Sequence, residues 1–220
     1  MKFTYSIPTK ILFGPGSFND LATTPLPGKK ALVVITAGKS MRANGYLDRL
    51  IDMLDKQGIG HALFDKILPN PVLRHVHEGA ALAREQGCDF VIGLGGGSSI
   101  DSAKSIAVMA KNPGDYWDYI SGGSGKGQPL VNGALPIVAI ATTAGTGTEA
   151  DPWTVITKED TNEKIGFGCA ETFPVLSVVD PEMMSSMPKG LTASTGMDAL
   201  THAIEGYITP GAWSLSDCLS

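Results

Sequence analysis

Asp198 and His202 form a carboxylate and imidazole pair in the helix-like stretch GMDALTHAIEGY, residues 196–207. Residues four apart share one face of an α-helix, with Cβ atoms about 5–6 Å apart, so the two side chains can bind one metal ion together. A catalytic metal usually has about three protein ligands and an open position. Either a partner supplies the other ligands, or this pair is not a metal site.

A purely structural interpretation of the same stretch is also open. Thr195 would be the N-cap of a helix, Asp198 would lie near position N3 of a capping-box-like start, and His202 would complete an ordinary i,i+4 pair. Because such helix pairs are common, spacing alone favours this second interpretation.

A glycine-rich segment, GLGGGSSIDSAK at residues 93–104, lies between an expected buried strand and an expected helix. At such a junction, backbone N–H groups and the positive helix end bind phosphate. Gly95, Gly96 and Gly97 would let a pyrophosphate approach the backbone, and the Ser98 hydroxyl can donate. Ser98 stands where the fingerprint G-x-G-x-x-G has its third glycine, so a tight strand–helix turn is the alternative.

A second polar loop, ATTAGTGTEAD at residues 141–151, offers four threonine hydroxyls around two glycines. Both loops follow expected parallel strands, so they would line a single crevice for a cofactor with phosphates and hydroxyls. An ordinary threonine-rich surface loop is the alternative.

The elements that must position these loops follow from the hydrophobic pattern. Apolar runs alternate with helical periodicity from residue 30 onward, which predicts a parallel sheet with helices on both faces. Expected strands are 30–36, 60–65, 89–95, 135–141 and 174–180, and expected helices are 40–58, 71–87 and 99–111. A hairpin or a pair of strands is expected at 3–14 and a hairpin at 153–168. A loop is expected at 119–133, and a helix at 190–208 with another starting at the last residues.

Composition restricts the function classes. The chain has 220 residues, 43% of them hydrophobic, and a net charge of −5, so it can bury a sizeable core and has no basic stripe for nucleic acid or anionic membrane. It has no apolar run long enough to span a bilayer and no apolar signal core, so a cytoplasmic protein with a small-molecule partner is expected. Its three scattered cysteines fit neither a disulfide framework nor zinc ligation, and His75 and His77 are expected at the surface.

Three motifs in order, GGGSSIDSAK (95–104), ATTAGTGTEAD (141–151) and STGMDALTHAIEGY (194–207), resemble the iron-containing (group III) alcohol dehydrogenase family. The resemblance runs over essentially the whole chain. It implies an N-terminal α/β domain that binds NAD or NADP, here residues 1–187. It also implies an all-helical metal-binding domain, of which residues 188–220 would be only the beginning, and it makes a homo-oligomer the expectation.

The resemblance assigns roles by position. The pyrophosphate would be held by Gly95, Gly96, Gly97 and Ser98, the nicotinamide side would be bordered by Thr142, Thr143 and Gly145, and further cofactor contacts would come from Asn70 and Lys164. Asp198 and His202 would be the first two ligands of Fe²⁺ or Zn²⁺, and the family takes two more histidines from helices further downstream. This raises the metal interpretation above the structural one.

One turn bears on the choice between NAD and NADP. Many NAD-using members carry an acid just after the first strand of the alternation, where it binds the ribose hydroxyls and repels a 2′-phosphate. The turn here, VITAGKSMRANG, has no acid between Val34 and Gly45, and Lys39, Ser40 and Arg42 can attract a phosphate. We therefore expect NADP to be favoured.

The implied reaction of a complete enzyme is reversible oxidation of a primary alcohol to an aldehyde. Two alternatives stay open: a catalytically inactive nucleotide-binding fragment, and a metal-free reductase or glycerol-dehydrogenase-like relative on the same scaffold. The residues do not identify the alcohol, the metal or the number of subunits.

Overall fold

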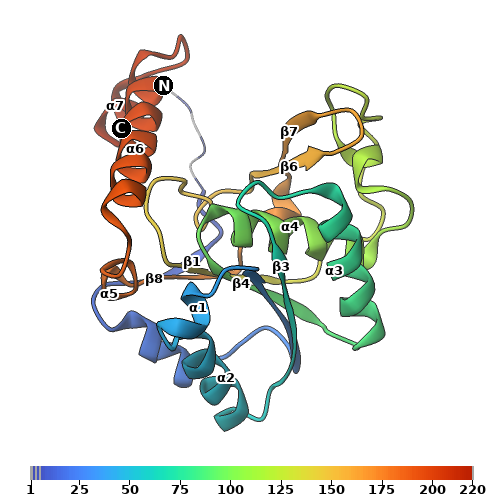
Figure 1. Cartoon of the computed structure of the whole chain (residues 1–220). Coiled ribbons are helices and arrows are strands. Elements are labelled where there is room, and N and C mark those ends of the chain that lie inside the picture. The colour runs from blue at the N-terminus through green and yellow to red at the C-terminus, as the bar shows by residue number, and fades with distance from the viewer. Residues whose placement is uncertain (1, 3, 5, 220) are drawn as a thin grey trace.

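The computed structural model describes residues 2, 4 and 6–219. Its centre is a six-stranded parallel sheet in the order β1-β8-β5-β4-β2-β3 (Figure 1). The strands are β1 (Lys10–Phe13), β2 (Lys30–Thr36), β3 (Gly60–Ile67), β4 (Phe90–Gly95), β5 (Ile137–Ala141) and β8 (Leu176–Val179). The α/β fold with a parallel sheet that the sequence predicts is confirmed.

Helices cover both faces of the sheet, which explains why its strands are continuous apolar runs. Val33 of β2 faces one hydrophobic cluster, and its neighbours Leu32 and Val34 face the other. The first cluster includes residues of η1 (Ser17–Ala22), α1 (Ser40–Ala43) and α2 (Tyr46–Lys56). The second includes residues of α3 (Leu73–Glu85), α4 (Gly97–Lys111) and η2 (Tyr116–Tyr119).

The strand order contains a reversal that creates a ligand crevice. From β2 the chain runs outward to β3 at the sheet edge and then crosses back, so that β4 lies on the other side of β2. The loops after β2 and β4 therefore diverge. In open α/β sheets such a divergence at the carboxyl ends of the strands is the usual ligand-binding position.

Two expected elements differ from the structure. Within the expected hairpin at 3–14, only Lys10–Phe13 forms a strand among the described residues, and it pairs in parallel with β8; residues 3 and 5 lie outside the described part. Pro8 lacks an N–H group, which disfavours a second strand beside it. The expected helix 40–58 is divided into α1 and α2 because Gly45 adopts a left-handed φ of +70°.

The expected second hairpin is present. Strands β6 (Thr154–Lys158) and β7 (Glu163–Phe167) form a separate antiparallel pair, and Asn162 between them has a φ of +54°. A parallel bridge between Val72 and Thr157 ties this hairpin to the segment before α3. The 3-10 helix η3 (Ala170–Thr172) follows β7.

Helix α5 (Pro181–Met184) lies beside the sheet, with Met183 in the first hydrophobic cluster. Helices α6 (Lys189–Ile208) and α7 (Ser214–Leu219) extend away from the sheet (Figure 1). All of α6 lies in the described part of the chain, and none of its residues is buried. Its large exposed apolar side chains are Leu191, Met197, Leu200, Ile204, Tyr207 and Ile208.

The surface position expected for His75 is wrong. His75 is buried and lies edge-on to Phe64, with ring centroids 6.3 Å apart. His77 lies on another side of α3, where its Nε2 is 3.3 Å from Asp115 Oδ2.

None of the described helices is long and apolar enough to cross a membrane.

Candidate active site

The two glycine-rich loops meet at the carboxyl ends of β4 and β5. Thr142 donates its backbone N–H to the carbonyl of Gly95 at 2.9 Å. A Cβ atom on Gly96 would lie 2.8 Å from Thr143 Oγ1, and one on Gly97 would lie 2.9 Å from a methyl carbon of Thr146. The glycines are therefore needed for the loops to approach each other, a role that the sequence pattern did not indicate.

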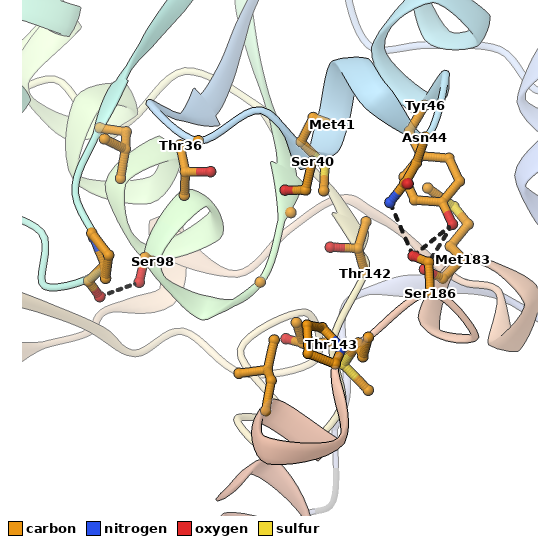
Figure 2. A pocket seen from close by; sticks show the side chains of 18 of the residues that line it. Thr36, Ser40, Met41, Asn44, Tyr46, Ser98, Thr142, Thr143, Met183 and Ser186 are labelled. Carbon is orange, nitrogen blue, oxygen red and sulfur yellow. Dashed lines mark hydrogen bonds between the residues drawn. The ribbon is translucent and has the colours of Figure 1, made fainter. Parts of the chain in front are cut away.

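A cavity of about 320 Å³ opens at this junction (Figure 2). One side is formed by the turn after β2, which includes Ser40, and by both glycine-rich loops. In addition to Ser40, the cavity is lined by five of the residues that the resemblance assigned to the cofactor: Gly95, Gly96, Ser98, Thr142 and Thr143. Gly97 lies behind this surface, against Thr146.

The opposite wall is apolar and was missed by sequence reasoning. It is formed by side chains from α1, α2, α5, the segment after α5 and the start of α6: Met41, Tyr46, Met183, Met187 and Leu191. Tyr46 donates its hydroxyl to the carbonyl of Met183 at 3.0 Å, and Asn44 donates to Ser186 Oγ at 3.0 Å (Figure 2). Because these residues are distant in sequence, only the fold brings them together.

Helix α4 presents its N-terminus to the cavity. The N-cap is Gly96, and no side chain among the described residues caps the helix there. First-turn N–H groups of a 15-residue helix, together with its dipole, are suited to an anionic group. The Ser98 hydroxyl donates to the carbonyl of Pro69 at 2.5 Å, which fixes the loop after β3 beside the helix start.

Asn70 and Lys164 come together although they are 94 positions apart. Lys164 Nζ donates to Asn70 Oδ1 at 3.2 Å, and both groups are exposed. Lys164 lies on β7, as expected, and Asn70 follows the carbonyl that Ser98 binds. The hairpin therefore places an ammonium group beside the loop that adjoins the start of α4.

Asp198 and His202 lie on α6 next to the second glycine-rich loop. His202 Nε2 is 4.0 Å from Asp198 Oδ1, and the side chains are 55% and 41% exposed. The Nδ1 atom of His202 is 3.2 Å from the carbonyl oxygen of Gly145. A Cβ atom on Gly145 would lie 3.2 Å from Asp198 Oδ2, so the second glycine-rich loop and the pair are in close contact.

The expected capping role of Thr195 is wrong. Helix α6 begins at Lys189, directly after Pro188 at the N-cap, so Thr195 lies in its second turn. The Thr195 hydroxyl instead donates to the carbonyl of Leu191 at 3.0 Å. The capping interpretation therefore gives no structural reason for an acid at position 198.

The two basic side chains after β2, Lys39 and Arg42, differ in their surroundings. Lys39 is exposed beside the cavity rather than in its lining. Arg42 donates to Asp65 Oδ2 at 2.5 Å, with both side chains 46% exposed. Lys39 therefore remains available at the rim, whereas Arg42 already has an acidic partner.

Comparisons with known proteins identify the family. The profile of the family described as "Iron-containing alcohol dehydrogenase" matches residues 8–181. Choline dehydrogenase from Bacillus subtilis (strain 168) is 40% identical over 219 residues, which cover 99% of this chain and 54% of that protein. The chain thus spans about half the length of the curated relatives it matches.

Solved structures agree with this assignment. NADH-dependent butanol dehydrogenase A from Thermotoga maritima superposes with a TM-score of 0.90 at 34% identity, over 99% of this chain and 54% of the other. Sulfoacetaldehyde reductase from Bifidobacterium kashiwanohense in complex with NAD⁺ gives a TM-score of 0.86 at 32% identity, over 99% and 56%. With the profile matching most of its length, the chain belongs to the iron-containing alcohol dehydrogenase family.

Proposed function

We propose that the whole protein is a metal-dependent alcohol dehydrogenase that oxidises a primary alcohol reversibly to an aldehyde with NADP⁺ or NAD⁺. The contact between His202 Nδ1 and the Gly145 carbonyl carries this proposal, because it places the candidate metal pair directly on the loop assigned to the nicotinamide. Relatives named as alcohol and propanediol dehydrogenases support the reaction class.

The cofactor lies across the crevice in this proposal. Its pyrophosphate is held at the start of α4 by Gly95–Ser98, with Lys164 and Asn70 nearby. The apolar wall that includes Met183 and Leu191 receives the adenosine. Thr142, Thr143 and Gly145 then border the nicotinamide, close to α6.

Asp198 and His202 fit half of an Fe²⁺ or Zn²⁺ site. Their separation of 4.0 Å is too long for a hydrogen bond. If His202 donates its Nδ1 proton to the Gly145 carbonyl, the Nε2 lone pair stays free to bind a metal, the usual arrangement of metal-binding imidazoles. Oxygen and nitrogen ligands suit either metal. Among the described residues, no cluster of three or more histidine, cysteine or acidic side chains completes the set.

The chain's own residues supply positioning in this reaction. The glycine loops would hold the nicotinamide next to α6, and the Gly145 carbonyl orients the His202 ring. When bound, the metal would polarise the substrate oxygen and favour the alkoxide, and the nicotinamide would accept the hydride.

The cofactor preference that we propose is NADP. The turn after β2 lines the cavity and carries Lys39 at its rim, with no acid that would repel a 2′-phosphate. Arg42 would have to exchange Asp65 for the phosphate, so Lys39 is the residue expected to contribute.

Residues 188–220 begin a helical metal-binding domain in this proposal. The exposed apolar side chains of α6 support it, since a helix with such a surface is normally covered by other protein. The remaining half of the whole protein would cover α6 and supply the other metal ligands.

Steady-state oxidation of a series of primary alcohols by the full-length protein tests the proposal. We expect NADP⁺-linked turnover that disappears after chelation and returns with Fe²⁺ or Zn²⁺. Turnover that is unaffected by complete metal removal would favour a metal-free reductase instead.

A further inference from the structure

A buried ionic cluster lies behind the two glycine loops, outside the cavity. Lys104 of α4 is fully buried, with a side chain that is 0% exposed. Its Nζ lies within hydrogen-bond distance of the Thr148 hydroxyl (2.8 Å), the Asp151 carbonyl (2.9 Å), the Asp151 carboxylate (3.2 Å) and the Trp153 carbonyl (2.8 Å). All of these acceptors belong to residues 148–153, in the segment that continues from the second glycine-rich loop.

Asp101, one turn earlier on α4, completes the arrangement. Its Oδ1 accepts from the Thr148 hydroxyl at 2.7 Å, and its Oδ2 accepts from the backbone N–H of Val155 at 2.9 Å. Thr148 is thus both an acceptor from Lys104 and a donor to Asp101. We call Asp101, Lys104, Thr148 and Asp151 the Lys104 cluster.

Burial of these two charged groups costs free energy, so a contribution to stability does not by itself explain the Lys104 cluster. Burying a lysine and an aspartate is unfavourable, as burial lowers the pKa of Lys104 and raises that of Asp101. Well-packed apolar residues in the same place would often be as stable. An ion network in place of apolar packing gives directional bonds that hold one loop conformation.

The segment that the Lys104 cluster binds belongs to a loop that contacts both the cavity and His202. Upstream of Thr148, Thr142 and Thr143 line the cavity, and Gly145 contacts His202. The helix that holds it is the one whose N-terminus carries Gly97 and Ser98. A single rigid helix therefore supports the phosphate-binding turn at one end and the loop beside the metal pair one to two turns further along.

We propose that the Lys104 cluster is the positioning device that sets the distance between the cofactor and the metal pair, by fixing residues 142–153 to α4. Lys104 is a positioning residue here, since it touches neither cavity nor α6 among its contacts in the described chain. This inference rests on the proposed function.

The test compares four variants in the full-length protein: Lys104→Met, Thr148→Val, Thr148→Ser and Val108→Ala. Lys104→Met and Thr148→Val keep the shape of the side chain and remove its hydrogen bonds. Thr148→Ser keeps the bridging hydroxyl. Val108→Ala creates a cavity at a buried position one turn beyond Lys104 and lowers stability without removing a hydrogen bond of the cluster.

We expect Lys104→Met and Thr148→Val to raise the Kd for NADPH about tenfold and to lower kcat about 100-fold, as a misplacement of about 1 Å can do. Thr148→Ser should restore both values to near wild type. Val108→Ala should lower Tm with both values unchanged.

Two results would overturn the inference. One is wild-type Kd and kcat in folded Lys104→Met or Thr148→Val; the other is equal losses in Val108→Ala at a matched fall in Tm. Failure of the proposed function is distinguishable, because the wild-type protein would then bind neither NADPH nor NADH in the same titration.

Discussion

Replacement of Gly145 by alanine tests whether the cofactor loop and the metal pair are coupled through direct contact. Gly145 has a φ of +104°, and a Cβ atom there would lie 2.5 Å from the carbonyl oxygen of Thr195. Ordinary contact begins at 3.4 Å, so the loop or α6 must move by about 0.9 Å. Because residues 148–153 that follow Gly145 are bonded to Lys104 of α4, we expect α6 rather than the loop to move.

The expected effect of Gly145→Ala has two parts, a loss of folding stability and a loss of rate. An alanine at such a φ costs about 1–3 kcal/mol of folding free energy, regardless of its neighbours. A displacement of nearly 1 Å between cofactor and metal can lower the rate about 100-fold. Gly147→Ala isolates the first part, since Gly147 also has a positive φ, +67°, but a Cβ there would meet nothing within 4 Å.

The assay is thermal unfolding, metal titration and steady-state alcohol oxidation of both variants in the full-length protein. We expect both to lose stability, but only Gly145→Ala to lose metal affinity and about 100-fold in kcat. Equal kcat and metal affinity in the two variants would show that the contact between the Gly145 loop and α6 does not couple cofactor and metal.

Three further predictions follow from particular contacts. His202→Ala should remove metal binding and nearly all turnover while the NADPH titration is little changed, because His202 lies on α6 outside the phosphate-binding turn; retained turnover would contradict its role. Lys164→Met should weaken NADPH binding and reduce its salt dependence, because an exposed ammonium beside Asn70 is lost, and an unchanged salt dependence would place the phosphates elsewhere. Burial raises the pKa of the Cys88 thiol, so a thiol reagent at pH 8 should label exposed Cys218 first and Cys88 only upon unfolding, as peptide mapping would show.

The sheet could be predicted from the sequence because its strands are buried on both faces. Residues 31–35 and 135–141 are apolar throughout, a pattern typical of strands in a parallel sheet that is covered on both faces. The glycine loops were located for a similar reason, since each follows such a strand directly. Local pattern therefore carries the architecture and the position of the crevice.

The features that could not be predicted from the sequence depend on contacts between residues that are distant in the chain. The apolar wall joins Tyr46 to Met183, which are 137 positions apart. His75 follows the helical period but is buried by Phe64 of a neighbouring strand. The buried position of Lys104 could not be predicted from the sequence, because a lysine in a helix is ordinarily exposed and only the fold brings Thr148 and Asp151 to it.

In the proposed function, cofactor and metal act on one substrate in this crevice. A single-turnover experiment examines this: the full-length protein is mixed with NADP⁺ and a primary alcohol that carries deuterium at C1, with metal present or removed. We expect deuterium at C4 of the nicotinamide only when Fe²⁺ or Zn²⁺ is bound. Absence of deuterium transfer in the metal-loaded protein across the alcohol series, or equal transfer without metal, would contradict it.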